Sequence, residues 1–227
     1  MNIYHHPSDD ILAAYAAGTT DEATALVIAT HMALCPACRR AVAGLEAVGG
    51  VLMDETAAVP LAAQSWQAVE ARISSAAAAP RQIERRGPSI KGPAIDSGGF
   101  DSRIPRPLRD YLDARVERLG WRRVGPGVRR VPLAVGPGAT ARLLEIAPGT
   151  ELPRHGHSAA EFTLVLAGGY ADEGGHYVRG DLEEASVDDV HRPRVDLGEP
   201  CLCLVVTAGP LRLTGLVGRL LQPLVRF

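Results

Sequence analysis

Three histidines and a glutamate in the second half of the chain restrict its possible folds more than any other feature. His155 and His157 are separated by one residue, so in an extended strand both side chains point to the same face. An adjacent strand with Glu161 and a later strand with His191 would complete a pocket of three imidazoles and one carboxylate. Zinc, iron, manganese and nickel all accept such ligands. Two histidines on a surface strand are the alternative, and the matched spacing disfavours it.

The sequence around these residues changes to short strand-like segments separated by Gly and Pro. Many short strands at nearly regular spacing favour an antiparallel β-barrel or jelly roll. The last segment, 211–227, is apolar and fits either a final strand or a terminal helix. The expected strands are 128–135, 139–146, 161–167, 170–178, 189–192 and 202–207.

The first 79 residues have a different pattern, because they are rich in alanine and their apolar residues recur at helical spacing. This predicts four helices near 9–17, 21–33, 36–53 and 64–78. In residues 80–106 the apolar residues recur at neither helical nor strand spacing, which predicts a flexible linker. An amphipathic helix is expected after this linker, at 107–120. The predicted fold class is therefore α + β in two independently folding domains, a small helical bundle at 1–79 and a β-barrel domain at 107–227.

A second group of potential metal ligands lies in the helical half. His31, Cys35 and Cys38 would come together at a helix end followed by a turn, and Pro36 favours the start of a new helix there. Zinc prefers such nitrogen and sulfur ligands in a tetrahedral arrangement, and either His5 or His6 could supply the fourth. The alternative is a buried pair of small cysteines beside a surface histidine.

Two further features allow more than one interpretation. Trp66, Val69 and Ile73 form one apolar face of the fourth expected helix, which could enter a groove on a partner or complete the domain's own core. Cys201 and Cys203 share one face of a strand, where they could face the metal, undergo oxidation or pack as small hydrophobic residues. We favour packing.

Charge and hydropathy exclude several classes of protein. The net charge is −2 and the isoelectric point is near 6.4, which disfavours direct binding to nucleic acid. The N-terminus has no secretory signal, and the longest apolar runs are too short to cross a bilayer. We therefore expect a soluble cytoplasmic protein.

The helical half resembles the zinc-binding anti-sigma domain of bacterial regulators. The resemblance implies that His6, and not His5, joins the cysteines and His31, and that the partner is a sigma factor of the extracytoplasmic-function type. It covers residues 1 to about 79 and rests on the pattern His6-x5-Leu12-x2-Tyr15-x2-Gly18 followed by His31-x3-Cys35-x2-Cys38.

The second half resembles a cupin domain. Residues 149–168 match the first cupin motif at every fixed position, and this implies the metal ligands His155, His157, Glu161 and His191. The second motif keeps Gly180 and His191 but has Ser186, Asp188 and Val195 in place of its usual proline, glycine and asparagine.

Together the two halves resemble ChrR-type regulators. This implies an anti-sigma factor with one zinc in the helical domain and a second divalent metal, expected to be zinc, in the cupin. The cupin would release the sigma factor under singlet oxygen or related oxidative stress. We expect no catalytic residue. A cupin metalloenzyme of the dioxygenase kind, with an accessory zinc domain, is the alternative.

Overall fold

The computed structural model describes residues 2–78, 101–112, 115–209 and 211–213. Within these residues no helix is long and apolar enough to span a membrane. The part of the expected linker at 80–100 and the last segment from 214 to 227 lie outside the described residues.

The four helices expected in the N-terminal half are confirmed. Gly18 ends the first with a positive φ of 67°, and Asp21 caps the second by accepting hydrogen bonds from the backbone N–H groups of Ala23 and Thr24. Pro36 stands in the first turn of the third, where its missing N–H costs nothing. The helices are α1 (Asp9–Ala16), α2 (Glu22–Leu34), α3 (Pro36–Asp54) and α4 (Ser65–Ala78).

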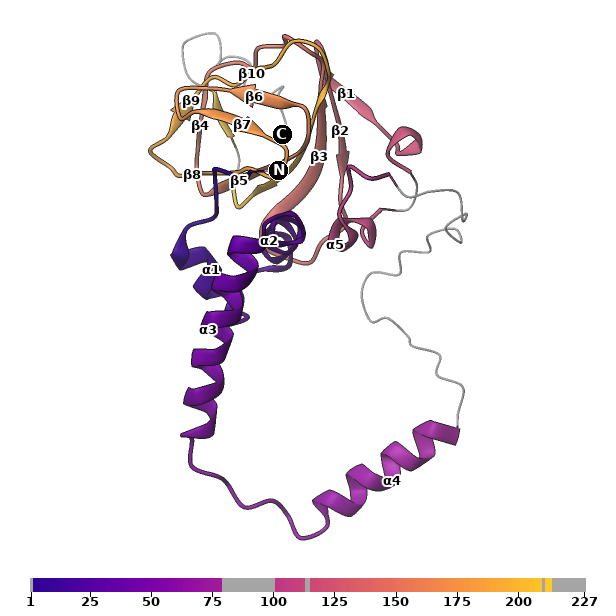
Figure 1. The fold of residues 1–227 in the computed structure, drawn as a ribbon. Helices are drawn as coiled ribbons and strands as arrows, with labels where there is room; N and C mark the ends of the chain where they lie inside the picture. The colour runs from indigo at the N-terminus through magenta and orange to yellow at the C-terminus, as the bar shows by residue number, and fades with distance from the viewer. Residues whose placement is uncertain (1, 79–100, 113–114, 210, 214–227) are drawn as a thin grey trace.

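These helices do not form a four-helix bundle as expected. Figure 1 shows α1, α2 and the start of α3 together beneath the β-rich half, whereas the rest of α3 and all of α4 extend away from it. The apolar face of α4 is open to solvent, with Trp66 67 % exposed and Ile73 62 % exposed. The apolar side chains of α4 therefore do not complete a core of their own domain. An irregular segment containing Pro60 separates α3 from α4 and carries the chain away.

The C-terminal half consists of antiparallel strands. A six-stranded sheet has the order β1-β2-β3-β11-β5-β8, and two three-stranded sheets have the orders β10-β6-β7 and β12-β4-β9. The strands are β1 (Arg122–Gly125), β2 (Val128–Pro132), β3 (Thr140–Ile146), β4 (His155–His157), β5 (Glu161–Ala167), β6 (Gly169–Ala171), β7 (His176–Val178), β8 (Leu182–Ala185), β9 (Val190–His191), β10 (Arg194–Val195), β11 (Cys201–Thr207) and β12 (Leu211–Leu213).

Two expected elements are divided in the structure. The segment 170–178 is a hairpin, because the Asp172 side chain accepts hydrogen bonds from the N–H groups of Gly174 and Gly175 and turns the chain between β6 and β7. The helix expected at 107–120 is replaced by α5 (Arg106–Arg109) and a short 3₁₀ helix, η1 (Val116–Arg118). Strands β1, β8 and β10 were not expected.

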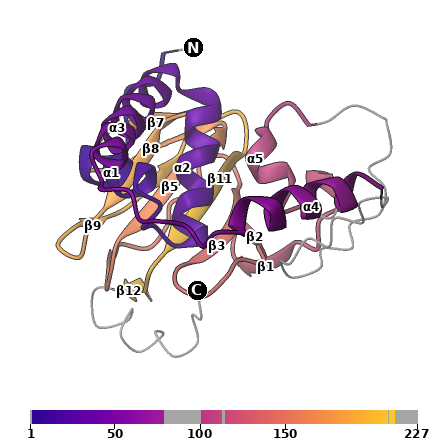
Figure 2. The same ribbon diagram turned by 90° about the horizontal axis from the view of Figure 1, so that it is seen from below.

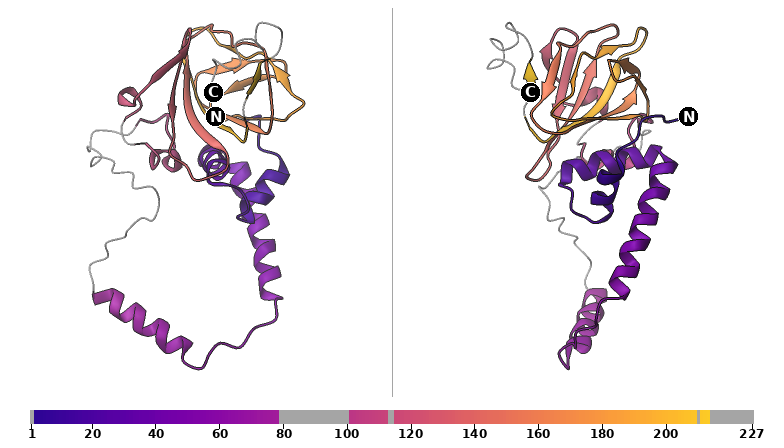
Figure 3. Two further views of the ribbon diagram at one scale, coloured as in Figure 1. Left: turned by 180° about the vertical axis from the view of Figure 1, so that it is seen from behind. Right: turned by 90° about the vertical axis from the view of Figure 1, so that its left-hand side faces the viewer.

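Helix α2 joins the two halves of the molecule. It lies across β5 and β11, as the view from below shows (Figure 2), and it also contacts α5. Its buried residues, among them Val27 and Ile28, belong to the same apolar core as Leu164 and Leu204 of the sheet. Ile104, inside the expected linker, is buried in this core as well. The further views in Figure 3 show the same contact between the helices and the sheet. Among the described residues the helical half and the sheet therefore share one apolar core, to which part of the expected linker contributes.

Candidate metal centres

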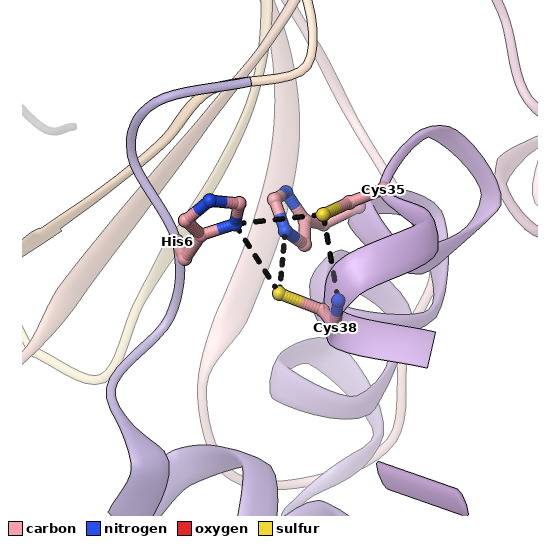
Figure 4. A group of neighbouring side chains, drawn as sticks. His6, Cys35 and Cys38 are labelled. Atoms are coloured by element: carbon pink, nitrogen blue, oxygen red, sulfur yellow. Dashed lines mark hydrogen bonds between the residues drawn. The ribbon is translucent and has the colours of Figure 1, made fainter. Parts of the chain in front are cut away.

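The first centre is formed where α2 ends and α3 begins. His31 stands in the last turn of α2, Cys35 is the residue between the two helices, and Cys38 lies in the first turn of α3. His6 comes from the extended segment before α1, and Figure 4 shows its ring directed at the two sulfur atoms. One ligand atom from each of these four side chains lies within 4.8 Å of the others.

The distances between these atoms fit a tetrahedral site. Nδ1 of His6 is 3.4 Å from each cysteine sulfur, and Nε2 of His31 is 3.2 Å from the sulfur of Cys38. Nitrogen and sulfur ligands on one tetrahedral zinc ion would be separated by about 3.5 Å. The Cys35 sulfur also accepts a hydrogen bond from the N–H of Cys38. The backbone therefore holds both thiols at the start of α3.

The electrostatics of this group favour a bound cation. Burial lowers the pKa of His31 to about 4, so its imidazole is neutral at pH 7. Burial, a hydrogen bond from the Cys38 thiol to Cys35 and the charge of Cys35 together raise the pKa of the Cys38 thiol to about 12. Two adjacent buried thiolates are costly unless a positive charge compensates them. The donor set, its spacing and its burial all fit zinc.

The second centre lies inside the β-rich half. His155 and His157 of β4 face the same side, Glu161 begins β5, and His191 ends β9. β4 and β9 pair directly, with His155 opposite His191. All four residues are buried, and one ligand atom from each lies within 4.8 Å of the others.

Hydrogen bonds behind the imidazoles decide which nitrogen faces the pocket. Nδ1 of His155 donates to the carbonyl of Pro153 at 2.9 Å, so the lone pair of its Nε2 points inward. Nε2 of His191 is 3.1 Å from Nε2 of His155 and 3.2 Å from Nε2 of His157. Three ring nitrogens thus converge on one point, as the ligands of a metal do.

The pKa values of the residues in this pocket are shifted in different directions. Burial lowers the pKa of both His155 and His157 to about 4. Burial raises the pKa of Glu161 to about 7, although the guanidinium of Arg142 opposes this shift. Oε2 of Glu161 and Nδ1 of His157 are buried without a hydrogen-bond partner among the described residues. A divalent cation would compensate the Glu161 carboxylate and accept the inward lone pairs.

Comparison with known proteins gives the family. Residues 9–39 match a zinc-finger family, and residues 112–212 match the ChrR cupin-like domain. The chain is 43 % identical over 226 residues to the anti-sigma-E factor ChrR of Cereibacter sphaeroides, which covers the full length of both proteins. The chain belongs to the ChrR family. A solved structure of Rhodobacter sphaeroides SigE in complex with the anti-sigma ChrR covers 91 % of this chain and all of the matched chain, at 43 % identity and a TM-score of 0.76.

More distant likenesses cover less than half of this ChrR-family chain. An RmlC-like cupin protein from Ralstonia eutropha is 21 % identical over 42 % of this chain, with a TM-score of 0.38. KdgF from Halomonas is 19 % identical over 41 % of it, with a TM-score of 0.37. Neither likeness is strong enough to carry an argument about function.

The cupin-like domain of this ChrR-family chain has two acidic residues that the sequence analysis missed. Nδ1 of His191 lies 2.8 Å from Oδ2 of Asp172 and 3.0 Å from Oε1 of Glu183. Burial lowers the pKa of His191, but the hydrogen bonds and charges of Glu183 and Asp172 outweigh burial and raise it to about 9. These carboxylates orient the ring of His191 with Nε2 toward the pocket. Isolated acidic residues in a strand and a turn gave no sequence signal for this role.

The second cysteine pair belongs to neither of the two candidate ligand groups. The sulfur atoms of Cys201 and Cys203 are 3.3 Å apart on β11, and both residues are buried in a smaller apolar core with Val128 and Ile146. A hydrogen bond with Cys201, together with burial, raises the pKa of Cys203 well above its ordinary value, so it remains a thiol. Of the interpretations left open by the sequence, packing as small apolar residues agrees best with this environment.

Proposed function

We propose that this chain is an anti-sigma factor that binds and inhibits a sigma factor of the extracytoplasmic-function type. The observation that carries the proposal is the full-length relationship to anti-sigma-E factor ChrR, together with the structural likeness to the SigE complex. Because a sigma factor acts with RNA polymerase on the chromosome, we place the chain in the cytoplasm. The net charge of −2 gives no support to direct contact with nucleic acid.

The surface that would bind the sigma factor is the apolar face of α3 and α4. Many large apolar side chains on these helices are exposed, and few residues of either helix are buried. An amphipathic helix with apolar residues at intervals of three and four is suited to a groove on a partner protein. The members of this apolar face are Leu45, Val48, Val51, Leu52, Met53, Trp66, Val69 and Ile73.

In this proposal His6, His31, Cys35 and Cys38 bind a structural zinc ion. The ligands come from three segments, so the metal would tie the N-terminal segment to the junction of α2 and α3. This tie sets the direction of α3, the helix that leads to the proposed sigma surface. The role of zinc is thus structural, and no chemical step is assigned to it.

The cupin centre is proposed to control release. His155, His157, Glu161 and His191 would hold a second divalent metal, expected to be zinc, and oxidative stress such as singlet oxygen would alter this site and lower sigma affinity. Four buried ligands, two of them with a polar atom that makes no hydrogen bond among the described residues, support a resident metal. This division gives inhibition and response separate ligand sets.

A cupin metalloenzyme of the dioxygenase kind remains the alternative function. Its metal ligands would be the same, but nothing in the described residues identifies a substrate site, and we assign no catalytic residue. The family relationship favours a regulator.

One experiment separates the two functions. The full chain is expressed in its native host, purified under reducing conditions and examined for metal content and co-purified protein. An anti-sigma factor retains a stoichiometric sigma factor and silences transcription by it in a reconstituted assay with RNA polymerase. If no sigma factor is bound or inhibited, the proposal is wrong, and turnover of a small molecule would favour the enzyme.

A further inference from the structure

The residues from Gly180 to Glu184, here called the β8 segment, contact the helical half through both backbone and side-chain groups. The carbonyl oxygen of Gly180 accepts a hydrogen bond from Nδ1 of His31 at 2.9 Å. The N–H of Leu182 donates to the carbonyl of His5 at 3.1 Å. His31, a candidate zinc ligand, and His5, the neighbour of the candidate ligand His6, are therefore hydrogen-bonded directly to the β-rich half.

Asp181 strengthens this contact. Its side chain is fully buried, and Oδ1 accepts hydrogen bonds from the N–H groups of Tyr4 at 2.7 Å and His5 at 3.1 Å. Its other oxygen accepts from the N–H of Val178, which anchors the carboxylate within the cupin. Asp181 thus holds the backbone of Tyr4 and His5, the two residues immediately before His6, by hydrogen bonds.

The next residue but one, Glu183, faces the other centre. Oε1 of Glu183 lies 3.0 Å from Nδ1 of His191, and its second oxygen accepts a hydrogen bond from the hydroxyl of Tyr170. Glu184, on the opposite face of the strand, instead accepts hydrogen bonds from Ser8 ahead of α1. Because strand side chains alternate in direction, neighbouring residues of one strand reach the two halves of the molecule.

The β8 segment is also held along its length. It pairs with β5 in continuous register, with Leu182 opposite Leu164 and Glu184 opposite Phe162. Leu182 is buried in the core that α2 shares with the sheet. Because the segment is paired and packed, a displacement of Glu183 also moves Gly180 and Asp181, whereas a free loop would absorb it.

We propose that the β8 segment couples the two metal centres, with Asp181 as a positioning residue for the cysteine centre and Glu183 as a positioning residue for the cupin centre. An ordered cupin centre holds His191 against Glu183, and the segment then presents the Gly180 carbonyl and the Asp181 carboxylate to the zinc ligands of the helical half. Disorder at the cupin centre weakens zinc binding at the cysteine centre. The consequence for sigma release rests on the proposed function, but the coupling itself does not.

The test is a double-mutant cycle in the full-length chain. Zinc affinity of the cysteine centre is measured by competition against cobalt(II), whose thiolate charge-transfer absorption reports only the site with cysteine ligands. We compare the wild type, His155→Ala, Glu183→Ala and the double variant. His155→Ala, which empties the cupin centre, is expected to weaken zinc binding about fivefold or more, within the usual range for coupled sites. In the Glu183→Ala background the same change is expected to have almost no effect.

Two conservative variants and one control complete the experiment. Glu183→Gln keeps an acceptor for His191 and is expected to restore the coupling. Asp181→Ala is expected to lower zinc affinity about tenfold or more, as removal of a group that orients a ligand does. Asp181→Asn, which keeps an oxygen for Tyr4 and His5, is expected to recover most of the affinity. The control is Asp196→Ala, which removes an exposed carboxylate paired with His176 and is expected to leave the cycle unchanged.

The results that overturn the coupling are distinct from those that overturn the proposed function. Equal zinc affinity in the wild type and His155→Ala, or an equal effect of His155→Ala with and without Glu183, refutes the coupling. If Asp181→Ala does not fold, as judged by circular dichroism, the Glu183 cycle alone decides. A chain that shows the coupling but does not inhibit a sigma factor refutes only the proposed function.

Discussion

Nδ1 of His31 donates a hydrogen bond to the carbonyl oxygen of Gly180, 2.9 Å away, across the boundary between the helical half and the cupin. The carbonyl can only accept, and burial keeps the imidazole neutral by lowering its pKa to about 4. The lone pair of Nε2 therefore faces His6 and Cys38. A residue of the cupin thus selects the tautomer that a zinc ligand of the helical half requires.

Removal of one thiol should abolish the first metal centre. We expect Cys38→Ala to lose its tightly bound zinc and most of its sigma inhibition, because three ligands remain in a region that the metal ties together. Metal analysis and a transcription assay measure the two effects. Cys203→Ala is the matched control, since that cysteine is equally buried but belongs to neither candidate ligand group, and it should keep the zinc and the inhibition. Full sigma affinity in a zinc-free Cys38→Ala protein would contradict the structural role of zinc.

Loss of the cupin ligands should abolish the response without abolishing resting repression. We expect alanine at His157 or His191 to strip the second metal, while the core shared with α2 keeps the protein folded. The cysteine centre should remain occupied, because a several-fold loss from a tight zinc site leaves it nearly saturated. Transcription from a sigma-dependent promoter is recorded in cells exposed to singlet oxygen. Normal induction in both variants, with the cupin metal shown to be absent, would mean that this centre is not the sensor.

The apolar face of α3 and α4 should be needed for sigma binding and not for stability. Trp66 is 67 % exposed, so Trp66→Ala should change the unfolding free energy little but cost about 2 kcal/mol of binding, or roughly a 30-fold rise in Kd. Titration calorimetry with the purified sigma factor gives the Kd, and thermal unfolding gives the stability. Val187→Ala, at an exposed apolar residue of the cupin, should leave the Kd unchanged. Loss of stability without loss of affinity in Trp66→Ala would refute this assignment.

Metal binding at the cupin centre should strengthen as pH rises. Without metal, Glu183 and Asp172 hold the pKa of His191 near 9, and burial holds that of Glu161 near 7, so both carry protons that a metal must displace. The affinity should rise about tenfold per pH unit between 7 and 9, where only His191 loses a proton, and then level off. Below pH 7 the metal should displace about two protons, because Glu161 is then protonated as well. The affinity should therefore depend on pH more steeply there.

This dependence is measured by metal competition at a series of pH values in the chain with an intact cysteine centre. Glu161→Gln carries no titrating proton, so its slope below pH 7 should fall to that of one group. A flat affinity between pH 7 and 9 would show that His191 is not protonated before the metal binds.

The local pattern of the sequence was sufficient to predict most elements and both candidate ligand sets. Helical spacing of apolar residues gave α1 to α4 within one residue at each end, and the spacing of His155, His157 and Glu161 indicated one pocket. Both signals are short-range, because the side-chain direction in a helix or strand follows directly from residue number.

The joining of the two halves was decided by the tertiary structure. The ten residues from 25 to 34, ALVIATHMAL, are apolar on nearly every side of α2, and such a helix is buried on more than one face. The sequence could not name what covers each face: α1 and α3 on one, and β5, β11 and α5 on the other. No local pattern indicated the roles of Asp181 and Glu183 either. The partners of Asp181 are Tyr4 and His5, at the other end of the chain, and the partners of Glu183 are Tyr170 and His191, on other strands. Such contacts exist only once long-range strand pairing has brought distant backbone groups to one edge, and no local spacing encodes that pairing.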